Sequence, residues 1–444
     1  MMRMARALLS LTLVWTALIC TALPAEIAKL PEPYQSLAEL ARGAPPEFTA
    51  DALLRIVEQR REQGRPADKD ARRDLIEEAF RSAAAAGFPV RMQGLAGATG
   101  DTASGSLSRA YALKLDALSL ESRAVHDMLP LDPANARKLF GEIARPTLAP
   151  LTCDDALVYD LSDFYQSLSA VVNGTFTPKE RAKDEHLSLL SDYLGQATSP
   201  LELAPLVQVI LGASLTEQQK QALMARLEAL LESMQTDDRS FSAALSALHS
   251  LSLAELQTSL EKYRRRNHEC ASDASQGDKA TPPAKKPSTP KLDPYWQSAA
   301  SKRMLEYGRK LRYSEGRALT DADRSTPEWQ QQVADYLNLM SLWSADQENS
   351  EADYYHEKCI VLTALIELAP PGPLTDKLLA DYVDFVGNSN LYRESPAEWF
   401  SEPRALLDRM EPMPAIHAKI LDAFRRSGNP VLNLEVALER TLAR

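Results

Sequence analysis

Apolar residues recur at every third or fourth position along most of the chain, which is the spacing of an amphipathic helix rather than of a strand. The clearest stripes are formed by Phe48, Ala52 and Ile56 and by the apolar residues within 76–83. We expect these two helices to form an antiparallel hairpin. Alternating runs of branched residues bounded by turn pairs are missing, so the fold class is predicted to be all-α.

Helix starts are marked by a cap residue followed by proline at the first helical position. This signature occurs at Asp132-Pro133, Thr177-Pro178, Ser199-Pro200, Thr326-Pro327 and Ser395-Pro396. Capping boxes, in which two side chains three residues apart satisfy free backbone amides, are predicted at Thr216/Gln219, Ser252/Glu255 and Ser395/Glu398. Helices of about ten to twenty residues with short connections predict stacked antiparallel hairpins, arranged as a solenoid-like or an irregular helical array.

Two segments interrupt the helical pattern. Residues 271–294 are rich in Pro, Lys, Ser and Thr, and such a segment cannot bury enough apolar surface to offset its ordering entropy. We predict a disordered linker there, between an N-terminal helical domain at 26–270 and a C-terminal helical domain at 295–444. The stretch from Gly87 to Gly105 is predicted to be a long surface loop.

The first 25 residues have the layout of a secretory signal peptide, because Arg3 and Arg6 precede an apolar run that ends near small residues. An apolar run of about thirteen residues is too short to span a bilayer, which takes about twenty. Cleavage is expected after Ala22 or Ala25. In the alternative, a lipoprotein signal, Cys20 becomes the lipidated first residue. Either way the sequence predicts a periplasmic or secreted protein with no transmembrane segment after cleavage.

The formal net charge of −11 becomes more negative when the signal leaves, and such a chain repels the phosphates of nucleic acids. We therefore expect no nucleic-acid partner. The remaining cysteines, Cys153, Cys270 and Cys359, are widely spaced and form no metal-binding cluster. Free cysteines are the expected state, although an oxidising compartment permits one bridge.

The first candidate site is a helix expected to open at Cys153 and to continue through Tyr165. It places Asp160 and Asp163 three positions apart on one face, a spacing that suits metal binding or acid and base steps. A solvated face opposite apolar residues is the favoured interpretation.

The second candidate joins Asp353 and His356, because a carboxylate three residues before a histidine is half of a helical-bundle di-iron site. No other histidine of the chain has a carboxylate three residues before it, so the second pair of ligands that a di-iron site needs is missing. We expect a histidine–aspartate contact on an exposed helix. No cofactor is predicted.

The third candidate is the segment from Arg393 to Phe400. Glu394 and Ser395 resemble the catalytic Glu-Ser pair of lytic transglycosylases, but the glycine-rich segment that should follow in that family is missing. Trp399 adjoins Phe400, and neighbours on a helix cannot both point straight inward. One member of this pair, and one of Tyr354-Tyr355, is therefore expected to be partly exposed on a recognition surface.

Residues 151–160 and 395–400 are similar to segments of uncharacterised exported all-helical bacterial proteins. This resemblance implies a bacterial origin and carries no function.

No phosphate-binding loop, nucleophile elbow or zinc-protease motif occurs. The sequence therefore predicts an exported helical scaffold for a protein or peptide partner in the cell envelope. The alternative is a cell-envelope glycan or peptide hydrolase in which Asp160, Asp163 or Glu394 converge around an interhelical cleft.

Overall fold

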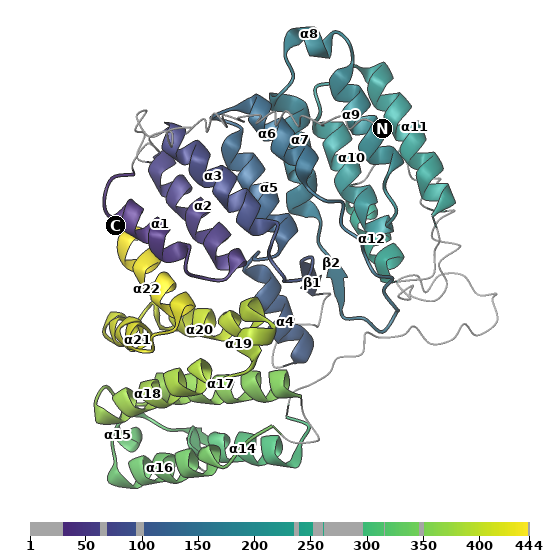
Figure 1. Cartoon of the computed structure of the whole chain (residues 1–444). Coiled ribbons are helices and arrows are strands. Elements are labelled where there is room, and N and C mark those ends of the chain that lie inside the picture. Colours follow the sequence, from purple (N-terminus) through teal and green to yellow (C-terminus); the bar gives the residue numbers. More distant parts are fainter. Residues whose placement is uncertain are drawn as a thin grey trace, which may run out of the picture.

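The computed structural model describes residues 30–62, 69–94, 102–234, 239–251, 261, 296–314, 316–345 and 350–442. These residues are mostly helical, with two short two-stranded sheets, which confirms the all-α class (Figure 1). The predicted signal peptide and the predicted linker lie outside the described residues.

Among the described residues before position 271, the helices are α1 (Tyr34–Ala41), α2 (Pro46–Glu62), α3 (Lys69–Ala83), α4 (Ala103–Ala112), α5 (Ala117–Met128), α6 (Pro133–Glu142), α7 (Ser162–Gly174), α8 (Pro178–Arg181), α9 (Glu185–Gly195), α10 (Leu203–Gly212), α11 (Glu217–Ser233) and α12 (Arg239–Ser250). A short 3₁₀ turn, η2 (Pro200–Glu202), precedes α10, and strand β1 (Met92–Gly94) pairs antiparallel with β2 (Leu157–Tyr159).

After position 294 the described helices are α14 (Ala299–Lys310), α15 (Asp321–Arg324), α16 (Pro327–Ser341), α17 (Glu351–Leu368), α18 (Pro373–Gly387), α19 (Leu391–Glu394), α20 (Pro396–Met410), α21 (Pro414–Arg426) and α22 (Pro430–Leu442). Strands β3 (Tyr313–Ser314) and β4 (Arg317–Ala318) form a small hairpin between α14 and α15.

The end of the chain returns to its beginning. Helix α20 packs against α4, and α22 packs against α1 and α2, so that the yellow helices of Figure 1 lie next to the purple ones. The rings of Phe48 on α2 and Phe400 on α20 meet edge to face, with centroids 5.2 Å apart. One continuous cluster of buried apolar residues extends from Tyr34 to Leu438. The helices on the two sides of residues 271–294 therefore share a core.

Several local predictions are confirmed. The expected apolar stripes of α2 and α3 are buried. The side chains of Asp132, Thr177 and Thr326 cap α6, α8 and α16 as expected. Thr216 and Gln219 form the predicted capping box of α11, whereas Ser252 and Glu255 lie outside the described residues. These features depend only on residues a few positions apart.

The helix predicted from Cys153 is wrong. Residues 157–159 form β2, and α7 begins at Ser162. Arg91 and the strand that follows it supply the pairing partner, since the backbone amide of Asp160 donates to the carbonyl of Arg91 at 2.9 Å. The Asp160 carboxylate then accepts a hydrogen bond from the backbone amide of Ser162, the first residue of α7, at 3.0 Å. The predicted loop from Gly87 thus contains a strand as well.

Cys153 is disulfide-bonded to a partner outside the described residues, contrary to the expectation of free cysteines. Cys359 is free and buried in α17. The predicted capping box at Ser395 is also wrong, because Ser395 makes no side-chain cap and Glu398 turns toward His356 instead.

The expectation of an exposed aromatic in each adjacent pair is wrong. Trp399 is fully buried and Phe400 is 5% exposed. Both side chains are buried because α20 packs against α4 as well as against α17 and α21. The indole nitrogen of Trp399 donates to the carbonyl of Val386 at 2.9 Å, while Phe400 packs on Phe48. Tyr354 and Tyr355 are buried too, so no recognition surface forms from these pairs.

We predict that Trp399→Ala lowers the free energy of unfolding by about 3–5 kcal/mol, because it leaves a large cavity and removes the hydrogen bond from the indole nitrogen to Val386. Urea unfolding followed by circular dichroism measures the change. Leu342→Ala, at a residue that is 83% exposed, is the matched control and should change stability little. A loss below about 1 kcal/mol for Trp399→Ala would show that this side chain is not in the core.

Candidate functional site

Asp160 and Asp163 meet at one cation instead of forming a catalytic pair. Arg91 Nη2 lies 2.6 Å from Asp160 Oδ2, and Arg91 Nη1 lies 3.4 Å from Asp163 Oδ2. Lys114 Nζ is 2.9 Å from the other oxygen of Asp163. These contacts tie β2 and α7 to the start of β1. Glu394 is exposed at the end of α19 and joins neither carboxylate.

His356 is buried, not exposed as predicted, and its partners come from another helix. Its Nδ1 lies 2.8 Å from Glu402 Oε1 and its Nε2 lies 3.3 Å from Glu398 Oε1, both on α20. Asp353 stays at the first turn of α17, where its backbone amide donates to Ser350. The prediction of a histidine–aspartate contact failed because packing turned this face of α17 toward α20.

Charge in this cluster is balanced by its own members. Burial alone would lower the pKa of His356, but hydrogen bonds to Glu398 and Glu402 outweigh burial and raise it. Burial would raise the pKa of Glu402, yet the hydrogen bond and charge of His356, helped by Arg109, lower it. Arg109 Nη2 reaches Glu402 Oε1 from α4 at 3.2 Å. Because both ring nitrogens of His356 contact carboxylates of α20, and Arg109 of α4 contacts one of them, the cluster holds α4, α17 and α20 together.

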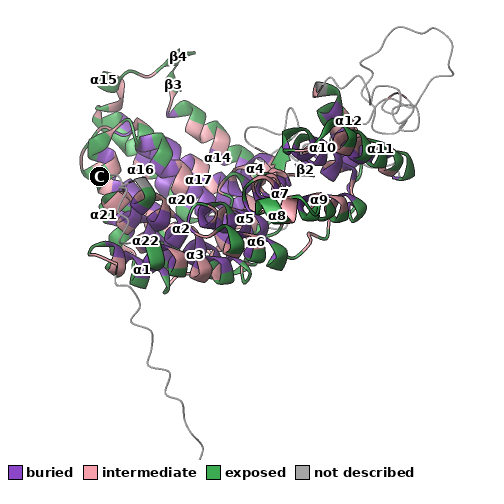
Figure 2. Ribbon diagram, turned by 90° about the horizontal axis from the view of Figure 1, so that it is seen from above, coloured by how far each residue is buried: buried purple, intermediate pink, exposed green. Residues whose placement is uncertain are grey.

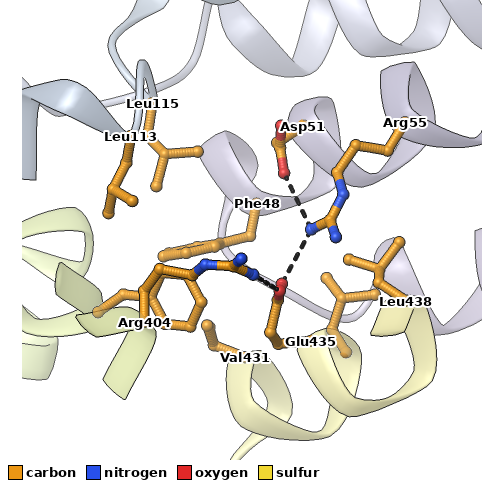
Figure 3. A pocket seen from close by; sticks show the side chains of 11 residues that line it. Phe48, Asp51, Arg55, Leu113, Leu115, Arg404, Val431, Glu435 and Leu438 are labelled. Atoms are coloured by element: carbon orange, nitrogen blue, oxygen red, sulfur yellow. Dashed lines mark hydrogen bonds and ion pairs between the residues drawn. The ribbon is translucent and has the colours of Figure 1, made fainter. Parts of the chain in front are cut away.

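A cavity of about 320 Å³ lies where α2, α20 and α22 meet the α4–α5 connection (Figure 3). Its walls combine apolar side chains with two arginines that point at one carboxylate. Arg55 Nη1 lies 2.9 Å from Glu435 Oε2, and Arg404 Nη1 lies 2.7 Å from Glu435 Oε1. Phe48 and Phe400 form part of the apolar wall.

The pKa of Glu435 is raised by its burial in the wall of this cavity. The positive charges of Arg55 and Arg404 lower this pKa, but by less than burial raises it. Glu435 is only 4% exposed, so its charge depends on both cations. Burial lowers the pKa of Arg404, but Glu435 and Asp408 outweigh that effect and raise it.

A second cavity, of about 480 Å³, lies between α2, α5 and α7. Leu113 lines both cavities. Arg123 connects their walls, since its Nη1 lies 2.6 Å from Asp51 in the first cavity and its Nε lies 2.8 Å from Glu58 in the second. We call the two adjoining cavities the seam groove. Asp163 also lines it, whereas Glu394 does not.

Helix α5 contributes two perturbed acids. Burial raises the pKa of Glu121 to about 7, and nearby Asp116 adds to the effect. Glu121 is 6% exposed and makes no hydrogen bond or ion pair with any described residue. Burial and the charge of Glu58 raise the pKa of Asp127 to about 6, although Arg61 Nη1 is 3.1 Å away. Asp127 lies in the wall of the seam groove.

Within the described part of the chain, no group of three or more His, Cys, Asp or Glu side chains is placed to hold a metal ion. The described helices also include none with the length and apolarity that a membrane crossing requires.

No protein-family model matches the chain, and neither the curated proteins nor the solved structures contain a significant match. The resemblance to exported bacterial proteins therefore stays an expectation.

The sequence pattern did not reveal Arg55, Arg404 and Glu435. Arg55 and Glu435 lie 380 positions apart, and neither belongs to a recognisable motif. The only local signal is that Asp51, Arg55 and Glu58 share one face of α2 beside its apolar stripe. That stripe predicts that α2 is buried, but it does not predict which distant residues pair with Asp51, Arg55 and Glu58.

We predict that stability falls as pH rises from about 5 to about 8. A raised carboxyl pKa means that the folded chain keeps a proton that the unfolded chain releases, so folding is favoured at the acidic end. Glu121 and Asp127 act in this direction, and so does His356, whose raised pKa favours folding only while it is charged. The lowered pKa of Glu402 acts only at more acidic pH.

Thermal melts across this range test the prediction, with Glu121→Gln expected to reduce the difference by about 2 kcal/mol. Glu142→Gln, on the exposed surface of α6, is the control and should leave the difference unchanged. A wild-type stability that is constant or rises over this range would contradict the assigned burial of Glu121.

Proposed function

We propose that the chain is an exported, non-enzymatic scaffold whose seam groove binds a protein or peptide partner in the cell envelope. The observation that carries the proposal is the groove itself, which consists of two adjoining cavities along α2 that share Leu113. Its apolar surfaces stay open, while its charged groups pair with one another. Such a wall suits an occupant that alternates apolar and charged side chains, as an extended polypeptide does.

The charge pairing favours binding over catalysis. Asp51, Glu58 and Glu435 each contact an arginine at 2.6–2.9 Å. A nucleophile or general base needs a free electron pair aimed at a substrate. Cations at the groove remain accessible, since the side chains of Lys114 and Arg61 are 52% and 45% exposed.

A photo-crosslinking residue at Leu113 tests the proposal in envelope extract. We expect polypeptide adducts at this position that decrease strongly when Arg61→Glu is added, because that change reverses a charge at the groove. The same crosslinker at Lys138 on α6, whose side chain is 72% exposed, is the matched control. Equal adducts at both positions, or adducts that ignore Arg61→Glu, would contradict binding in the groove.

A hydrolase remains the second candidate, and one observation favours it. Asp127 has a raised pKa and lines the groove, and perturbed acids in clefts are frequent at active sites. Hydrolysis of peptidoglycan fragments or casein by the wild type that Asp127→Asn abolishes would favour the hydrolase over the scaffold.

A further inference from the structure

Helix α14 carries an unusual concentration of positive charge for a chain whose net charge is −11. Its exposed cations are Lys302, Arg303, Arg309 and Lys310, and the half-buried Arg312 follows the helix; the one acid of α14 is Glu306. None of these five cations forms an ion pair with a described residue. By contrast, Arg55, Arg123 and Arg404 in the seam groove are all paired. We call this surface the α14 face.

Helix stability does not account for the α14 face. Cations in the last turn, such as Arg309 and Lys310, complement the negative end of the helix dipole. Lys302 and Arg303 lie near the other end, where the dipole gives cations no support and where the first turn contains no acid. The cluster therefore calls for an external partner of opposite charge.

An apolar pocket of about 120 Å³ adjoins two of these cations. Met304 of α14, Tyr336 of α16 and Ala364 of α17 contribute to its lining, and so do Arg309 and Arg312. A cavity of about 150 Å³ accepts a benzene molecule, so this pocket has the size for one apolar side chain.

An exposed aromatic residue, Tyr313, lies next to this cluster of cations in the chain. Tyr313 follows Arg312 directly and is 53% exposed. It lies in the β3–β4 hairpin, which stands out from the body of the protein in Figure 2. Tyrosine provides a rigid apolar ring with a polar tip, which is why it is enriched at binding surfaces.

We propose that the α14 face binds an acidic polypeptide segment that inserts one apolar side chain into the adjoining pocket. The charge of the face selects a negative partner, and the pocket selects a partner with a discrete anchor. An anionic lipid surface would also pair with the cations, but a lipid headgroup has no single apolar side chain to place in a pocket of this size. This site is separate from the seam groove and is occupied independently of it.

Binding of labelled peptides to the full chain, followed by fluorescence anisotropy at low salt, tests the proposal. The probe has three glutamates on each side of one leucine, and the matched peptide has serine in place of leucine. We expect the leucine peptide to bind about tenfold more tightly than the serine peptide, and added salt to weaken both.

Two variants and one control locate the site. Arg309→Glu should weaken both peptides about tenfold, because it reverses a charge at the pocket. Ala364→Leu should fill the pocket and abolish the preference for leucine while leaving the charge intact. Lys183→Glu makes the same charge change at an exposed cation after α8, at the opposite end of the molecule from α14 in Figure 1, and should leave binding unchanged. Circular dichroism melts check that each variant is folded.

Three results would overturn the proposal. The first is equal affinity for the leucine and serine peptides, which needs no variant. The second is equal weakening by Arg309→Glu and Lys183→Glu, which would indicate an unspecific charge effect. The third is binding to vesicles of anionic phospholipid without binding to the peptides, which would make the α14 face a membrane surface.

Discussion

The buried carboxylate of Glu435 accepts hydrogen bonds from Arg55 of α2 and from Arg404 of α20, and this triad joins the two ends of the chain. A buried carboxylate is stable only while its cations remain in place, because removal of one partner leaves an unpaired charge in an apolar environment. The triad therefore fixes how α22 lies against α2. The first cavity of the seam groove lies where α2, α20 and α22 meet, and Phe48 and Phe400 form part of its wall.

The His356 cluster repeats this arrangement at the neighbouring contact. Glu402 of α20 binds His356 of α17 on one side and Arg109 of α4 on the other. Histidine and glutamate are common catalytic residue types, but here His356 and Glu402 hold together helices that are distant in the sequence. Binding is accordingly assigned to two surfaces that these contacts leave open, the seam groove and the α14 face.

The limits of prediction follow from the distance between interacting residues. The capping of α6 by Asp132 and the stripe of α2 were predictable, because each depends on neighbours within a turn or two. Strand β2 was missed because its partner lies some 65 positions earlier at residues 92–94. His356 was misplaced and the seam groove was missed for the same reason, since Glu402 and Glu435 reach their partners only after distant helices pack.

Helices on both sides of residues 271–294 form one packed unit held by Glu435. The most direct measurement introduces a specific protease site within 271–294, cleaves the folded protein there and follows the fragments by size-exclusion chromatography. We expect the two fragments to elute together at the volume of the intact chain, and Glu435→Ala to promote their separation. Fragments of the wild-type sequence that separate at once and stay folded would contradict this packing.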